Sequence, residues 1–194
     1  MEPISFKTRV KETLINASKL YREHLVNFDY LIYSSEFQYE KYYIVSAKED
    51  NFYHLTGVES SLKSQAFFDA CVNGTLLEDD FDVGDKRRKG TIRRKIKVIE
   101  GATQIFLAPD ITIEEKFVKN KVSCSFASSD NQCTLGFTKT KISKPMTLLK
   151  DNELQNEVKP EFIARKKLDE EVFNEIILNV NGLDLESLLT ELGL

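Results

Sequence analysis

His54 is one of only two histidines in the chain and the residue whose type best suits acid–base chemistry. It lies in residues 51–58, Asn-Phe-Tyr-His-Leu-Thr-Gly-Val, whose apolar and aromatic content is typical of a β-strand. Side chains two positions apart in a strand point to the same face, so a strand places Thr56 beside His54. The segment therefore predicts an acid–base site formed by this pair. A core histidine bonded to a neighbouring group is the alternative.

An imidazole and a hydroxyl on one face suit the cleavage of RNA, which carries its own nucleophile, the 2′-hydroxyl. One group must take the proton of that hydroxyl, another must protonate the leaving oxygen, and cations must stabilise the charge on phosphorus. Histidine titrates near neutral pH and suits the proton transfers. We expect His54 as the acid–base residue, with Thr56, Lys139 and Thr147 completing the catalytic set.

Basic residues that would bind the phosphates of a nucleic acid are concentrated in one segment. Residues 86–97 hold eight Lys or Arg and no acid. Subtracting these eight charges from the net charge of −4 leaves −12 for the rest of the chain. Such asymmetry steers a polyanion to one face. We expect Arg93, Arg94 and Lys95 to bind nucleic acid, together with Lys144.

An acidic stretch directly before this basic segment offers an alternative. Residues 78–82 contain four acids, and Asp85 follows them. If the two segments fold back on each other, their charges are neutralised within the chain and no cationic surface remains.

Composition and missing motifs exclude several other classes of protein. The chain has no Gly-rich phosphate loop, no HExxH and no paired His/Cys ligand set, and its two histidines are 30 residues apart, so neither a metal nor another cofactor is expected. Three cysteines without CxxC spacing argue against a disulfide framework. No apolar run approaches the roughly 18–20 residues that span a bilayer, and no secretory signal is predicted, so we expect a cytoplasmic protein without a membrane partner.

Hydrophobic spacing in the first half of the chain predicts helices and strands in alternation. A stripe of apolar residues at spacings of three and four predicts a helix from Phe6 to Leu25. Helical spacing returns at residues 62–73, with Gly74 as the stop. Aromatic and β-branched runs predict strands at Phe28–Tyr33, 37–47 and 51–58, whereas residues 91–107 fit a helix only in part because Gly101 weakens it.

The second half is expected to be mostly strand and then helix. Alternating runs at 122–126 and 133–137, joined by a polar turn, predict a hairpin, and short strands follow at 146–149 and 158–165. Helical spacing over 169–180, with a stop at Gly182, and four leucines after Asp184 predict two C-terminal helices. We therefore expect an α+β fold with a domain at 1–168 and a helical extension at 169–194. The leucine face packs on the domain or docks a partner.

Five blocks of the sequence resemble a known family: residues 51–58 with the His-Leu-Thr-Gly core, the helix at 67–71, and the segments 91–97, 133–137 and 144–149. In order and spacing they are similar to the phage-associated barnase–EndoU–colicin–RelE-like (BECR) nucleases, in their fourth subgroup. The resemblance covers roughly residues 30–165. Position by position, His54 and Thr56 are the motif residues, and Gly136, Phe137, Pro145 and Thr147 belong to the later blocks.

The resemblance implies helices packed on a small, mostly antiparallel sheet and a metal-independent endoribonuclease that needs no cofactor. Its members are carried by phages and mobile elements of bacteria as toxins or effectors against RNA. It thus implies action in the cytoplasm of a bacterial host, with RNA (tRNA among the candidates) as substrate and an antitoxin or host protein as partner. The residues leave a second interpretation open. In it the same fold is catalytically inactive and binds nucleic acid through the basic segment, or binds a host protein or a second copy through the leucine helices.

Overall fold

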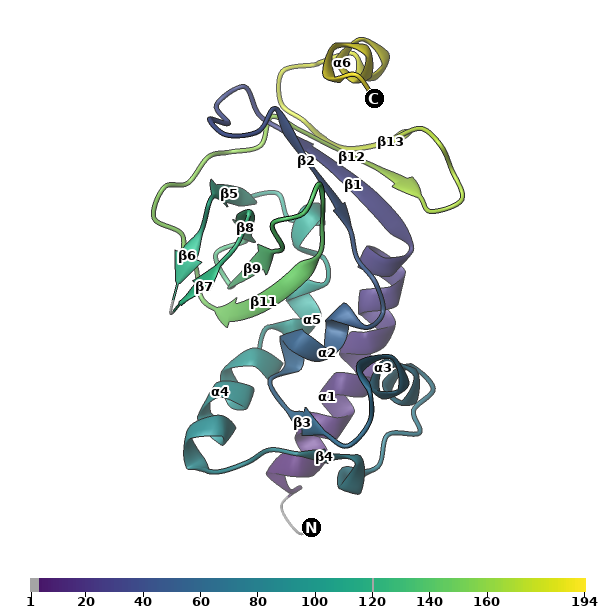
Figure 1. The fold of residues 1–194 in the computed structure, drawn as a ribbon, viewed down its shortest axis with the longest axis vertical. Coiled ribbons are helices and arrows are strands. Elements are labelled where there is room, and N and C mark those ends of the chain that lie inside the picture. Colours follow the sequence, from purple (N-terminus) through teal and green to yellow (C-terminus); the bar gives the residue numbers. More distant parts are fainter. Residues whose placement is uncertain (1–3, 120) are drawn as a thin grey trace.

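The larger of two sheets has five strands in the order β10-β2-β1-β12-β13 (Figure 1). The computed structural model describes residues 4–119 and 121–194. Neighbouring strands are antiparallel except for β10, which runs parallel to β2. The strands are β1 (Phe28–Tyr33), β2 (Tyr42–Ser46), β10 (Ile142–Ser143), β12 (Phe162–Lys167) and β13 (Glu175–Asn179).

The smaller sheet has four antiparallel strands in the order β11-β9-β8-β5. They are β5 (Thr112–Glu115), β8 (Phe126–Ser129), β9 (Cys133–Phe137) and β11 (Pro145–Lys150). The pairing of β8 with β9 confirms that a hairpin is present, but its first strand is Phe126–Ser129 and not the predicted run at 122–126, of which Val122–Ser123 belong to β7. Two further pairs of short strands lie outside the sheets: β3 (Glu59–Ser60) with β4 (Phe81–Asp82), and β6 (Val118–Lys119) with β7 (Val122–Ser123).

The helices gather mainly at the lower end of the molecule as drawn in Figure 1. They are α1 (Phe6–Tyr21), α2 (Asn51–Thr56), α3 (Ser64–Val72), α4 (Lys86–Ile96), α5 (Ile99–Ala102) and α6 (Leu185–Leu192). Short turns of other helix types are η1 (Arg22–Val26), which continues α1, η2 (Glu78–Asp80) and η3 (Ile105–Leu107). Among the described residues, no helix is both long and apolar enough to cross a bilayer.

The main core lies between α1 and one face of the large sheet. The predicted stripe of α1 is buried, with Leu14 and Tyr21 at 0% exposure, so this helix prediction is confirmed. Aromatic rings extend the core into the small sheet, where Phe126 stacks on Phe137 at 4.6 Å between ring centroids. Tyr30 and Tyr43 are buried here as well, as expected for tyrosines on a packed sheet. The α+β fold with a mostly antiparallel sheet is confirmed.

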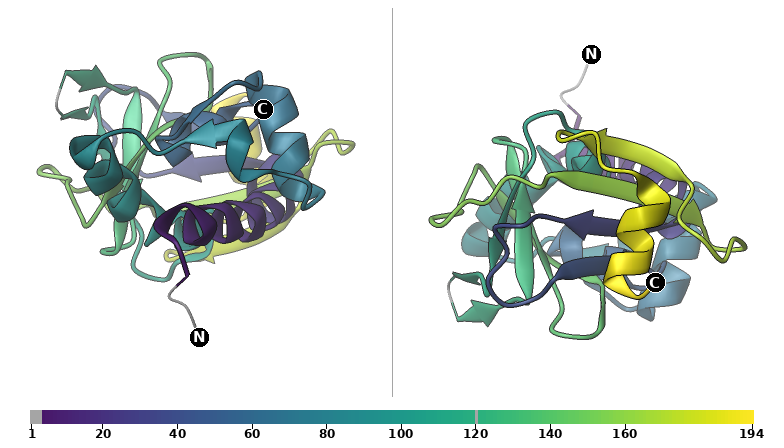
Figure 2. Two further views of the ribbon diagram at one scale, coloured as in Figure 1. Left: turned by 90° about the horizontal axis from the view of Figure 1, so that it is seen from below. Right: turned by 90° about the horizontal axis from the view of Figure 1, so that it is seen from above.

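The opposite face of the large sheet is covered by α6, which lies across it in the right-hand view of Figure 2. Leu188 and Leu189 are buried against Leu31 and Phe162 of the sheet. Asp184 starts the helix as predicted, because its side chain accepts a hydrogen bond from the Ser187 amide at 2.9 Å. The leucine face thus packs within the chain. A homodimer in which each α6 stays on its own sheet would need the other side of this helix, and a homodimer through α6 stays a prediction.

Four of the element predictions are wrong. The segment 51–58 contains a helix at Asn51–Thr56 and no strand. Residues 37–41 are not strand, and Val158 makes only an isolated bridge to Ile113 before β12 begins at Phe162. Residues 169–180 contain β13 at Glu175–Asn179 and no helix. The β-branched residues of this segment suit a strand, and Arg165 of β12 binds Glu175 at 2.6 Å across the pair. The large sheet therefore continues through residue 179, and one C-terminal helix is present where two were predicted.

Candidate active site

The segment that contains His54 is a six-residue helix ended by a glycine. Phe52 and Leu55, three positions apart, both pack into the main core and fix one side of α2. Gly57 follows with φ +79°, the left-handed conformation that commonly ends a helix. His54 falls on the opposite side of this short helix, where it is exposed to solvent. Its ring meets the edge of the Tyr53 ring at 5.7 Å between centroids.

Thr56 does not share a face with His54, so the pair predicted from strand geometry is wrong. In a helix, two positions correspond to more than half a turn. Thr56 is fully buried, and its hydroxyl donates to the carbonyl of Tyr53 at 2.8 Å. The same oxygen accepts a hydrogen bond from the Val58 amide at 3.3 Å. Thr56 therefore stabilises the end of α2 from inside the protein.

Lys95 of α4 is the cation that lies nearest to the His54 segment. Its Nζ donates to the backbone oxygen of His54 at 3.5 Å, and it is half-buried. Burial lowers the pKa of Lys95 to about 8. Within the described part of the chain it forms no ion pair with a carboxylate. An amine of this kind holds a proton at neutral pH and releases it more readily than an ordinary lysine.

The small sheet supplies the third side of this region, and Gly136 of β9 sets its spacing. Gly136 pairs with Thr147 of β11. A Cβ atom on Gly136 would lie 2.6 Å from Sγ of Cys124 and 2.8 Å from Cγ2 of Thr147. Only a residue without a side chain fits here, so Gly136 allows the half-buried Thr147 to lie close over β9. The two blocks that contain these residues, 133–137 and 144–149, thus pack together at this edge.

Helix α2, helix α4 and strand β11 pack against one another, which brings His54, Lys95 and Thr147 onto neighbouring elements. Figure 1 shows α2 between β11 and α4. Lys139 and Lys144 lie in the connection from β9 to β11, where Lys139 is exposed and Lys144 is half-buried. Lys144 is held by its backbone, whose amide donates to the Thr138 hydroxyl at 3.0 Å. No hydrogen bond in the described residues joins either lysine side chain to α2 or α4.

The three basic residues predicted as one phosphate-binding group point in different directions. Arg93 and Lys95 are two positions apart on α4, which places them on different sides of the helix. The Arg93 guanidinium lies 5.2 Å from the centre of the Phe6 ring of α1. Arg94 is exposed and reaches the hydroxyl of Thr91 at 3.4 Å. Only Lys95 faces the His54 segment.

The acidic and basic segments neutralise each other only in part. Asp85 starts α4, because its side chain accepts a hydrogen bond from the Arg88 amide at 2.9 Å, and Arg88 pairs with Glu59. In the described residues the cations of the second half of α4 make no ion pair. Among the described residues, Arg88 alone of this basic segment is therefore compensated, and its other cations present positive charge.

A comparison with family models matches residues 13–180 to the family described as phage-Barnase-EndoU-ColicinE5/D-RelE like nuclease4. The chain belongs to this family of phage nucleases. The match includes all five blocks that carry the resemblance and extends beyond the expected residues 30–165. Neither a comparison with curated proteins nor one with solved structures gives a match.

Because the chain belongs to a nuclease family, two residues beside His54 become relevant to its chemistry, Gly57 and Lys95. The role of Gly57 and the separate position of Lys95 were not predicted from the sequence. A signal was nevertheless present, because Lys95 follows the buried Ile92 by three positions and precedes the buried Ile99 by four. A lysine on the apolar stripe of an otherwise charged helix is one that packs inward. In the described residues, no three His, Cys, Asp or Glu side chains gather in a way that could hold a metal ion.

Proposed function

We propose that this member of the nuclease family is an endoribonuclease that cleaves RNA without a metal ion. The observation that carries the proposal is the exposed His54 of α2 with the half-buried amine of Lys95 against its backbone. Imidazole titrates near neutrality, and an amine with a pKa of about 8 exchanges protons in the same range. The two side chains provide an acceptor and a donor for the two proton transfers of RNA cleavage.

In the proposed reaction the 2′-hydroxyl oxygen attacks the adjacent phosphorus while the imidazole of His54 takes its proton. The bond from phosphorus to the 5′-oxygen breaks, and the Lys95 ammonium donates the proton that this oxygen needs. The products are a 2′,3′-cyclic phosphate and a free 5′-hydroxyl. Because the ammonium is positive until it gives up that proton, it also stabilises the charge that develops on the phosphate.

We assign supporting roles to most of the remaining predicted site residues. The Thr147 hydroxyl orients the scissile phosphate from β11, and Lys139 and Lys144 bind flanking phosphates from the connection before it. Arg94, exposed on α4, contacts the strand as it leaves the site. Thr56 acts from within, by holding the end of α2 in position.

The proposed setting of the activity is the cytoplasm of a bacterial host, where a phage or mobile element would use it as a toxin or effector. RNA is the substrate, with tRNA as one candidate, and an antitoxin or host protein is the partner that would control it. Growth of a bacterial culture after induced expression tests this role: arrest by the parent protein and normal growth with His54→Ala are expected.

Cleavage of RNA by purified variants tests the chemistry. His54→Ala is expected to lower kcat by about 100-fold or more, the usual contribution of a general acid or base. The matched control is His24→Ala, which changes the other histidine of the chain, located in η1. It should leave the rate unchanged. The assay is run with EDTA, and the 3′ ends of the products are examined for cyclic phosphate.

Three outcomes would contradict the proposal. Equal rates for His54→Ala and the parent exclude His54 as the acid–base residue. Complete loss of activity in EDTA, restored by a divalent cation, excludes the metal-independent reaction. Binding of RNA without any cleavage identifies the chain as the inactive binding module that the sequence left open.

A further inference from the structure

A pocket of about 460 Å³ lies between α1 and α4, and His54 is not part of it. Helix α1 contributes Arg9 and Thr13 at a spacing of four. Helix α4 contributes Arg93, and Lys97 directly follows the end of this helix. Its remaining lining residues are Phe6, Glu12, Asn16 and Ile96. The pocket is therefore a groove between two helices, with cations on both of its walls.

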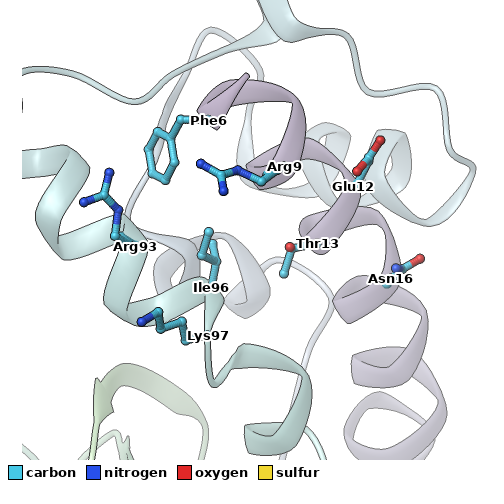
Figure 3. A pocket seen from close by; sticks show the side chains of 8 residues that line it. All are labelled: Phe6, Arg9, Glu12, Thr13, Asn16, Arg93, Ile96 and Lys97. Carbon is cyan, nitrogen blue, oxygen red and sulfur yellow. The ribbon is translucent and has the colours of Figure 1, made fainter. Parts of the chain in front are cut away.

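The positive charges of the groove are available to a ligand. Arg9, Arg93 and Lys97 are all exposed, and none of them makes an ion pair in the described part of the chain. Figure 3 shows Arg9 and Arg93 pointing toward the Phe6 ring from opposite sides, whereas Glu12 points away from them. The Arg93 guanidinium lies 5.2 Å from the centre of that ring. Two cations thus converge on the Phe6 ring, Lys97 lines the pocket as a third, and the one acid of the groove points away.

This combination of groups fits a single-stranded nucleic acid. A guanidinium group forms two parallel hydrogen bonds with a phosphate, and an ammonium group adds a further cation to the site. Aromatic rings and guanidinium planes bind the faces of bases, and a positive groove follows the backbone in proteins that hold single strands. The half-buried Phe6 and Ile96 provide such an apolar floor.

The groove lies on a different side of α4 from Lys95. Residues two positions apart on a helix are separated by about 200°, so Arg93 faces α1 while Lys95 faces α2. A ligand in the groove therefore does not touch the phosphate that would be cleaved beside His54. A nucleic-acid strand that passes over α4 and its exposed Arg94 would reach both sites with different nucleotides.

We propose that the groove between α1 and α4 is a second RNA-binding site, which holds phosphates of the substrate strand some nucleotides away from the bond that is cut. The proposal rests on the proposed function only in naming RNA as the strand. Its consequence is that the nuclease prefers long, single-stranded substrates. Short fragments reach His54 without the groove and gain nothing from it.

Binding of an uncleavable RNA tests the site independently of catalysis. The probe is a 2′-O-methyl RNA of about 16 nucleotides, the upper end of what one single-strand-binding fold covers. The full chain with Arg9→Ala and Lys97→Ala is compared with the parent by fluorescence anisotropy at several salt concentrations. We expect the Kd to rise about tenfold and the salt slope to fall by about 0.7 for each phosphate that the variant no longer neutralises. The matched control, Lys19→Ala, removes a charge from α1 outside the groove.

A cleavage assay gives the second measurement. The double variant should raise KM for long RNA and leave the cleavage of a dinucleotide unchanged. The proposal is overturned if the double variant has the Kd and salt slope of Lys19→Ala, or if a polyglutamate peptide binds the groove as tightly as RNA does. A parent protein that binds RNA through the groove but never cleaves it would refute the proposed nuclease reaction alone.

Discussion

The aliphatic chain of Lys95 occupies the space beside Gly57 that a side chain at residue 57 would need. A Cβ atom on Gly57 would lie 3.1 Å from Cδ of Lys95. The same glycine has φ +79°, which ends α2. The glycine of the His-Leu-Thr-Gly core thus meets two demands at once, because it stops the helix after His54 and makes room for the amine beneath it.

Gly57→Ala should therefore lower both stability and activity. The left-handed conformation costs a residue with a side chain about 1–2 kcal/mol, and the close approach of Lys95 adds to that cost. Urea denaturation measures the change in the free energy of unfolding. Gly74→Ala is the matched control, because Gly74 has φ +71° and nothing within 4 Å of its Cβ position. If both variants lose the same stability and retain the same rate, Gly57 does not position Lys95.

The pH dependence of cleavage should report the amine of Lys95. Burial lowers its pKa to about 8, so the ammonium loses its proton as the pH rises through that value. The deprotonated amine of Lys95 can no longer donate a proton, so kcat should fall above about pH 8. In Lys95→Arg the guanidinium stays charged, so the fall should move to higher pH even if the rate at neutral pH is lower. If kcat falls at the same alkaline pH in the parent and in Lys95→Arg, a group other than Lys95 causes the fall.

Stability should also depend on pH through this lysine. The pKa of Lys95 is about 8 in the folded protein against 10.5 for the ordinary side chain, so between these values the unfolded state binds more protons. The free energy of unfolding gains a contribution that rises with pH across that window. Lys95→Met should remove this contribution and stabilise the protein most below pH 8. Denaturation midpoints of the parent and of Lys95→Met at pH 7 and pH 10 measure this contribution. If both proteins show the same pH dependence, Lys95 does not contribute to it.

Gly136→Ala should destabilise the edge of the small sheet. The added methyl group would collide with Cys124 and Thr147 at less than 3 Å, and overpacking of this kind costs about 1–3 kcal/mol. Thermal unfolding measures the loss. Thr147→Ser in the same protein removes one of the two colliding atoms and should restore part of it. Gly90→Ala on α4, where nothing lies within 4 Å, should be harmless, and an equal effect at both positions would show that the spacing is not tight.

The leucines of α6 should contribute to the stability of the domain. Leu188 is 4% exposed against the outer face of the large sheet, so Leu188→Ala should cost about 2–5 kcal/mol, the range for buried leucines. Leu194→Ala is the control because that side chain is 46% exposed. Urea denaturation of both variants distinguishes them. If Leu188→Ala is neutral, α6 does not hold the sheet.

The sequence predicted elements well where a pattern was long and one-sided. The stripe of α1 and the alternation of β9 needed no tertiary information, and the family blocks pointed to the right relatives. Short segments failed, because six residues around His54 are too few to show a period. Phe52 and Leu55 fit a helix as well as a strand, and only Gly57 favoured the helix. In β13 the spacing of apolar residues matched a helix by coincidence, and pairing with β12 decided the outcome.

The sequence proposes the residue types of the candidate site, and the fold bears only on their arrangement. His54, Lys95 and Thr147 were chosen from the sequence, and the fold places them on three elements that pack against one another. The pairing of His54 with Thr56 failed because it depended on the strand. The direction of each basic residue on α4 depends on which neighbour packs there, and sequence spacing alone does not reveal that. Arg9 was missed because α1 meets α4 only in the folded chain.

Helix α6 belongs to residues 181–194, beyond the part of the chain that matches the family, and yet it seals an apolar sheet face of that part. Because a single helix covers this sheet face, the α6 helix of a neighbouring molecule can cover it equally well. Two copies that trade their α6 helices bury the same leucines without any new interface. Such an exchange would be detected in size-exclusion chromatography as a dimer whose share grows with protein concentration.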